Sequence, residues 1–110
     1  MKIETKYFGG IDRQSLQDFA DAYDLTMEVH DRGGSDGPGR FYAHFHRCEV
    51  IGGCMLSGTY GDGANPEDAM RSYTRRIAGK RVAIDAWLET RREIEVPVGL
   101  FFDDGATVKP

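Results

Sequence analysis

The stretch that decides the fold is residues 61–79, GDGANPEDAMRSYTRRIAG. A glycine-rich segment leads into a strong helix start, because Asn65 can cap the unpaired backbone amides and Pro66 suits the first helical position. Acidic residues in the first turn also favour a helix N-terminus. Apolar side chains then recur at helical spacing, at Ala69, Met70, Tyr73 and Ile77. The pattern predicts a helix with one buried stripe that ends near Gly79.

Strands are predicted on both sides of this helix. Apolar and polar residues alternate, as they do in half-buried strands, over residues 2–8, 25–30, 41–51, 55–60, 82–84 and 94–98. Gly52 and Gly53 are expected to turn the chain between the third and fourth of these segments, and residues 61–63 to end the fourth. Pro97 places the last strand at a sheet edge, since proline donates no ladder hydrogen bond.

Another helix is predicted after Asp12, which can cap it. Its apolar stripe consists of Leu16, Phe19, Ala20 and Tyr23. The expected order is therefore β-α-β-β-β-α-β-β. We predict a single α+β domain over residues 1–110, with both helices on one face of an antiparallel sheet. Cys48 and Cys54 fall on different rungs of the expected hairpin, so no disulfide is expected.

Positive charge is concentrated in residues 71–92. Seven of the fourteen basic residues lie there against Asp85 and Glu89, which makes the segment +5 in a chain whose net charge is −4. They are Arg71, Arg75, Arg76, Lys80, Arg81, Arg91 and Arg92. Such a segment indicates a local anion site. The alternative interpretation is a solvated helix face whose arginines pair with acidic residues and suit the C-terminal end of the helix dipole.

The sequence contains no catalytic constellation that we recognise. Neither cysteine nor Ser57 lies in the surroundings of an activated nucleophile, and we expect a protein that is not an enzyme and carries no cofactor. The spacing His44-x-His46-x-Cys48, with His30 on a neighbouring strand, supplies zinc-ligand residue types. Zinc sites usually show tighter, doubled spacing, and half-exposed strand histidines are common, so no metal site is expected.

Arginine and aromatic residues together would suit a nucleotide. The guanidinium fork meets two phosphate oxygens at once, and aromatic rings stack on bases. The candidate ligand-binding residues of these two classes are Tyr42, Tyr60, Arg71, Arg75 and Arg91. Residues 32–40 form a glycine-rich loop with an arginine at each end, which would suit a flap over a ligand. A surface hairpin loop is the simpler interpretation.

Four segments resemble small phage-encoded proteins, and the family that they resemble is the first class of Thoeris anti-defence proteins. They are YFGGIDR at residues 7–13, RFYAHF at 40–45, the GDG-to-GK helix unit at 61–80 and REIEVP at 92–97. The resemblance extends over most of the chain, between residues 7 and 97, although none of the four segments is diagnostic by itself.

The resemblance implies a sponge, which binds and sequesters a cyclic signalling nucleotide without degrading it. The expected ligand is a glycocyclic ADP-ribose isomer made by TIR-domain enzymes, or a cyclic oligonucleotide. Members assemble as dimers or larger homo-oligomers and hold the ligand near subunit interfaces with arginines, an aromatic residue and an amide. Carried onto this chain, the resemblance implies Arg40 and Arg92 as the arginines, with Tyr60 and Asn65 as candidates for the other two. The apolar residues 100–102 would serve self-association.

A nucleic-acid-binding or antitoxin module is the alternative. The order α-β-β-β-α over residues 12–77 matches a double-stranded-RNA-binding domain, and HicB-like antitoxins also place a small sheet against helices. A net charge of −4 weighs against a long polyanion, whose affinity depends on many phosphate contacts. No apolar run reaches the roughly 20 residues that span a bilayer, and residues 1–6 lack an apolar signal core. We therefore expect a cytoplasmic protein, of an infected bacterial host if the resemblance holds.

Overall fold

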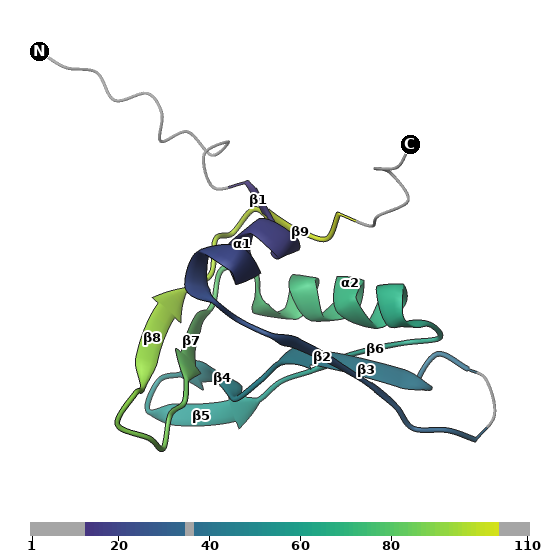
Figure 1. Cartoon of the computed structure of the whole chain (residues 1–110), viewed down its shortest axis with the longest axis horizontal. Helices are drawn as coiled ribbons and strands as arrows, with labels where there is room; N and C mark the ends of the chain where they lie inside the picture. Colours follow the sequence, from purple (N-terminus) through teal and green to yellow (C-terminus); the bar gives the residue numbers. More distant parts are fainter. Residues whose placement is uncertain (1–12, 35–36, 104–110) are drawn as a thin grey trace, which may run out of the picture.

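The computed structural model describes residues 13–34 and 37–103, and in these ranges it contains two helices and nine strands (Figure 1). The elements are β1 (Gln14–Ser15), α1 (Leu16–Tyr23), β2 (Met27–Asp31), β3 (Phe41–Phe45), β4 (Cys48–Gly52), β5 (Met55–Gly58), β6 (Gly61–Gly63), α2 (Pro66–Ile77), β7 (Arg81–Ile84), β8 (Arg92–Glu95) and β9 (Leu100–Phe101). The strand predicted over residues 2–8 and the predicted cap Asp12 lie outside the described residues. The predicted α+β class is confirmed.

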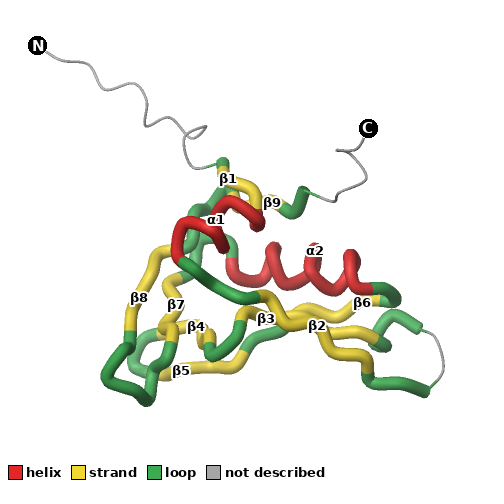
Figure 2. The backbone as a smooth tube through the Cα atoms, viewed as in Figure 1, coloured by secondary structure: helices red, strands yellow, loops and turns green. Residues whose placement is uncertain are grey.

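The described strands form two antiparallel sheets and one parallel pair. The first sheet has the order β2-β3-β6, and the second has the order β5-β4-β7-β8. β1 and β9 pair in parallel beside α1. Both helices lie on the same side of the sheets, above them in the view of Figure 2, as predicted. The strand predicted over residues 94–98 corresponds to β8, which lies at a sheet edge as predicted but ends at Glu95, before Pro97.

The strand predicted over residues 41–51 is divided in two. Arg47 has a left-handed φ of 55°, so the chain turns between β3 and β4, and β4 joins the second sheet. Residues 61–63 do not simply end a strand, because they form β6 and pair antiparallel with β3. These two differences replace the single expected sheet with two.

The β4–β5 hairpin turns one residue later than predicted. Gly52 pairs with Met55, so Gly53 and Cys54 form the turn, and Gly53 adopts a φ of 62° that favours glycine. Cys54 is exposed while Cys48 is buried, and both thiols are free, as expected.

α2 confirms the predicted helix and forms the centre of the core. Its buried residues are Ala69, Tyr73, Thr74 and Ile77. The ring of Tyr73 lies 5.5 Å from that of Phe45, and burial, together with the nearby Cys48, raises the pKa of the Tyr73 hydroxyl. Because Phe45 belongs to the first sheet and Cys48 to the second, Tyr73 joins the two sheets from the helix.

α1 begins after a different cap from the one predicted. The Ser15 hydroxyl accepts a 3.0 Å hydrogen bond from the Asp18 amide, which satisfies one of the unpaired donors of the first turn. Phe19 is fully buried, as its place on the stripe predicts. Tyr23 is on the same stripe but remains 38% exposed, because α1 ends there at the left-handed Asp24.

Candidate functional site

The first sheet turns one face toward α2 and leaves the other open. A Cβ on Gly61 would lie 2.1 Å from the Tyr73 amide nitrogen, so β6 faces α2 through its glycines. Side chains alternate across a strand, so Asp62 points to the opposite side. The strand register places with it Glu28 and His30 of β2 and Tyr42 and His44 of β3. We call these five residues the outer face.

Arg32 lies over the aromatic rings at one end of the outer face. Its Cζ atom is 4.4 Å from the Tyr42 ring centroid and 5.6 Å from that of Tyr60. The two tyrosine rings meet edge to face at 5.5 Å. Arg32 also donates a 2.9 Å hydrogen bond to Asp62, which raises the pKa of the guanidinium. The result is one cation held between two π faces and a carboxylate.

A shallow cavity of about 410 Å³ begins beside this cluster. It is lined by Tyr42, His44, Arg47, Cys48, Glu49, Gly58, Thr59 and Tyr60. Its volume lies within the roughly 300–1,000 Å³ of small-molecule sites. Arg47 supplies its cation, and the Arg47 guanidinium lies 3.7 Å from Asp85, too far for a direct hydrogen bond. We call this space the tyrosine cavity.

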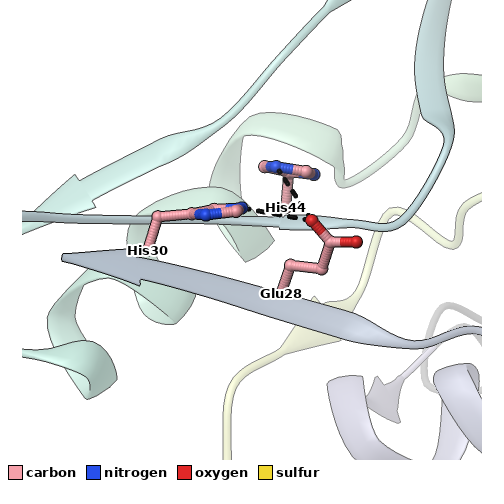
Figure 3. A group of neighbouring side chains, drawn as sticks. All are labelled: Glu28, His30 and His44. Atoms are coloured by element: carbon pink, nitrogen blue, oxygen red, sulfur yellow. Dashed lines mark hydrogen bonds and ion pairs between the residues drawn. The ribbon is translucent and has the colours of Figure 1, made fainter. Parts of the chain in front are cut away.

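The histidines gather around Glu28 at the other end of the outer face (Figure 3). The His30 Nε2 atom lies 3.1 Å from Oε1 of Glu28, and the His44 Nε2 atom lies 3.8 Å from it. His46 Nδ1 is hydrogen-bonded to the other carboxylate oxygen, and this bond is the main cause that lowers the pKa of Glu28. Cys48 does not join them, because it is buried on β4, where burial raises its pKa to about 11.

Two residues implied by the resemblance have structural partners elsewhere. Arg40 forms a two-pronged pair with Asp31, with hydrogen bonds of 2.9 and 3.0 Å, and this pair lowers the pKa of Asp31 to about 2. Asn65 caps α2 by accepting a 2.8 Å hydrogen bond from the Asp68 amide. The arginine that reaches Tyr42 and Tyr60 is therefore Arg32, not Arg40.

The basic residues of the segment 71–92 are spread over α2, β7, β8 and the turns between them. Arg71 pairs with Asp68 at 2.7 Å and Arg91 with Glu93 at 2.7 Å. Arg92 donates a 2.8 Å hydrogen bond to the Tyr23 carbonyl oxygen. Arg75 is exposed in the last turn of α2. These contacts agree with the alternative interpretation of the segment, in which arginines pair with acidic residues and suit the helix dipole.

Of the eight candidate ligand-binding residues, the structure brings together Tyr42 and Tyr60. Arg47 and Glu28 were not predicted, and Arg32 was considered only as an end of the glycine-rich loop at residues 32–40. Arg32 carried a signal, because residues 28, 30 and 32 share one face of an extended strand. Arg47 carried none, since its position depends on the turn that separates β3 from β4.

Comparisons of the chain with protein-family models, with curated proteins and with solved structures find no match. Within residues 13–34 and 37–103, neither helix is long and apolar enough to cross a membrane.

Proposed function

We propose that this chain is a sponge, which binds a compact nucleotide of the cyclic ADP-ribose type and sequesters it without degrading it, and so blocks a TIR-dependent antiviral defence. The observation that carries the binding proposal is Arg32 held over the rings of Tyr42 and Tyr60, two of the residues that line the tyrosine cavity. The ligand class and the setting come from the resemblance in the sequence.

The site has the chemistry that a nucleotide diphosphate requires. Tyr60 is 44% exposed, so its ring is available for stacking on a base. Arg47 lines the cavity, and Arg32 lies over the rings of Tyr42 and Tyr60, which also line it, so both guanidinium groups are candidates for contacts to the phosphates. Asp62 holds Arg32 in place, and a bound phosphate would compete with this carboxylate for the same donors.

The one cysteine that lines the cavity, Cys48, is a poor nucleophile, which agrees with binding that involves no covalent step. Burial raises its pKa to about 11, so the thiol is protonated at neutral pH. A protonated thiol is a poor nucleophile. The site would therefore bind the ligand without changing it chemically.

Self-association is part of this proposal. Leu100, expected to serve it, is buried in the core instead, and Phe102 packs against that core. Large apolar side chains are exposed elsewhere, with Trp87 80% and Met55 67% exposed. A homo-oligomer would cover such side chains and would allow Arg75 or Arg92 of one subunit to approach the ligand of another.

The nucleic-acid alternative has less support. Five strands in two sheets separate α1 from α2, whereas a double-stranded-RNA-binding domain has three strands in one sheet. Two cations, Arg32 over Tyr42 and Arg47 in the cavity lining, would suffice for two phosphates but not for the long phosphate track of a duplex.

Calorimetry on the purified chain tests the proposal. The panel contains glycocyclic ADP-ribose isomers, canonical cyclic ADP-ribose, cyclic di- and trinucleotides and a short RNA duplex. We expect saturable binding of one cyclic nucleotide, which chromatography recovers intact after heat release. Arg32→Ala and Tyr60→Ala should each weaken binding at least about tenfold, the scale of a charge-assisted or stacking contact.

Arg81→Ala is the matched control, because Arg81 pairs with Glu93 and Glu95 on the second sheet, away from the tyrosine cavity. Its affinity should equal that of the unchanged chain. A panel without small-molecule binding, or full affinity in Arg32→Ala, would contradict the proposal. Duplex binding that collapses with added salt would favour the nucleic-acid alternative.

A further inference from the structure

All three histidines of the chain lie around a single carboxylate. His30 comes from β2, His44 from β3 and His46 from the turn after β3. One ligand atom from each of Glu28, His30 and His44 lies within 4.8 Å of the others, and His46 binds the second oxygen of Glu28. Figure 3 shows the His30 and His44 rings approaching the same carboxylate oxygen. The three histidines come from two strands and a turn, yet all of them lie against the carboxylate of Glu28.

The hydrogen bonding of His44 prepares it as a ligand. Its Nδ1 atom lies 2.9 Å from the Phe45 carbonyl oxygen, which can only accept, so Nδ1 carries the proton. In the neutral ring, Nε2 then presents a lone pair toward Oε1 of Glu28 at 3.8 Å. Metal-binding histidines are oriented in this way, by a bond from the other ring nitrogen to a carbonyl or carboxylate. Two facing lone pairs are stabilised by a cation between them.

We infer that Glu28, His30 and His44 form a binding site for a divalent transition-metal ion of the zinc class, with His46 bonded to the second carboxylate oxygen of Glu28. Imidazole nitrogens with a carboxylate oxygen are a preferred ligand set for zinc. Ligand atoms about 2.0–2.1 Å from a tetrahedral ion are separated by about 3.3 Å. The spacing of up to 4.8 Å therefore closes with side-chain shifts of an ångström or so. Partial exposure of Glu28 and His46 leaves room for these shifts.

This inference goes beyond the proposed function, since it concerns a metal ion at Glu28 and not the nucleotide. The two are connected in space, because the His30 ring stacks on Tyr42 with centroids 4.6 Å apart and His44 lines the tyrosine cavity. A bound cation would add positive charge beside that cavity.

Zinc titration of the full chain against a competing chelator tests the site, with cobalt absorption as a second probe. We expect one zinc ion per chain. Glu28→Gln and His44→Ala should each weaken zinc binding at least about tenfold, the scale set by losing a ligand or its support. Glu95→Gln makes the same change on an exposed strand carboxylate of the second sheet and should leave affinity unchanged.

Cys54→Ser removes the exposed thiol as an independent zinc ligand and should also leave affinity unchanged. Imidazole signals in nuclear magnetic resonance spectra provide a readout that needs no variant, and they should shift until one equivalent of zinc is added. The inference is overturned if zinc leaves these signals unchanged, if binding disappears with Cys54, or if folded Glu28→Gln and His44→Ala chains bind as tightly as the parent.

Discussion

Gly61 and Gly63 are the residues on which α2 depends most directly. A Cβ at Gly61 would lie 2.1 Å from the Tyr73 amide nitrogen, and one at Gly63 would lie 2.3 Å from the Ala69 amide nitrogen. Glycine is required here because a helix backbone lies directly on the strand, not because the chain must turn. The sequence pattern suggested a strand end at these glycines, whereas their structural role is close approach.

Gly61→Ala should reduce the free energy of unfolding by more than about 3 kcal/mol, since the helix backbone must move to admit one methyl group. Gly58→Ala is the matched control, because nothing lies within 4 Å of a Cβ at that strand position. It should change stability by less than about 0.5 kcal/mol. Urea unfolding followed by circular dichroism measures both. Equal stabilities of the two variants would show that α2 does not rest on β6 as described.

Each of the two helices begins after a single capping side chain. Asn65 and Ser15 each accept a hydrogen bond from an amide three residues later. Such caps are local, so the start of α2 was predicted correctly from its sequence. The start of α1 was not, because Asp12 and Ser15 are both good caps and only the packing of the helix selects between them.

Asn65→Ala should destabilise the chain by about 1 kcal/mol, because the Asp68 amide loses its acceptor. Asn65→Ser keeps a capping oxygen and should recover most of this loss. Thermal unfolding of the three chains gives the comparison. Ligand affinity measured on the same variants separates the two roles considered for Asn65. Unchanged stability in Asn65→Ala together with lost binding would assign the amide to the ligand instead of the helix.

Across the whole molecule, acidic side chains are paired with cations on both sheets. Arg40 holds Asp31 at the base of the β2–β3 loop, and Arg91 and Arg81 both contact Glu93 on β8. Each pairing lowers the pKa of its carboxyl group below the ordinary value. The chain carries a net charge of −4, and within the described residues several of its carboxylates are paired with arginines.

Stability should therefore fall in acid. The pKa of Asp31 is about 2 in the folded chain against an ordinary 3.8, so its contribution is complete above about pH 4 and is lost as the pH falls toward 2. Glu28 and Glu93 act in the same direction below about pH 4.5. These groups are partly exposed, so the effect is modest and decreases with salt.

Thermal unfolding between pH 2 and pH 7 checks this prediction. Asp31→Asn should make the decline below about pH 4 shallower, since it removes one titrating group. Asp21→Asn is the control, because Asp21 on α1 accepts its hydrogen bond from the uncharged Gln17. Parallel pH profiles for Asp31→Asn and the unchanged chain would contradict the role assigned to the Asp31–Arg40 pair.

The strands were predicted where residues close in the sequence define them, and were not predicted where contacts between distant residues do. Apolar positions move from odd numbers at Phe41 and Phe45 to even numbers at Cys48 and Val50. This change of parity indicates a turn near Arg47, because the apolar side chains change to the other face of the strand. Because the turn was not predicted, the division of the strands into two sheets could not be predicted either. The tyrosines of the candidate site were predicted, while its arginines, Arg32 and Arg47, were not among the candidate ligand-binding residues.

The sequence by itself determined both helices, the α2 cap, the existence of the β4–β5 hairpin and the α+β class, because these follow from residues a few positions apart. Only the tertiary structure decided which strands pair, why β6 needs glycines, and which polar groups meet. Glu28 and His46 are 18 positions apart and Arg32 and Asp62 are 30 apart. Their contacts depend on strand register, and a slip of one residue would send every side chain to the other face of the sheet.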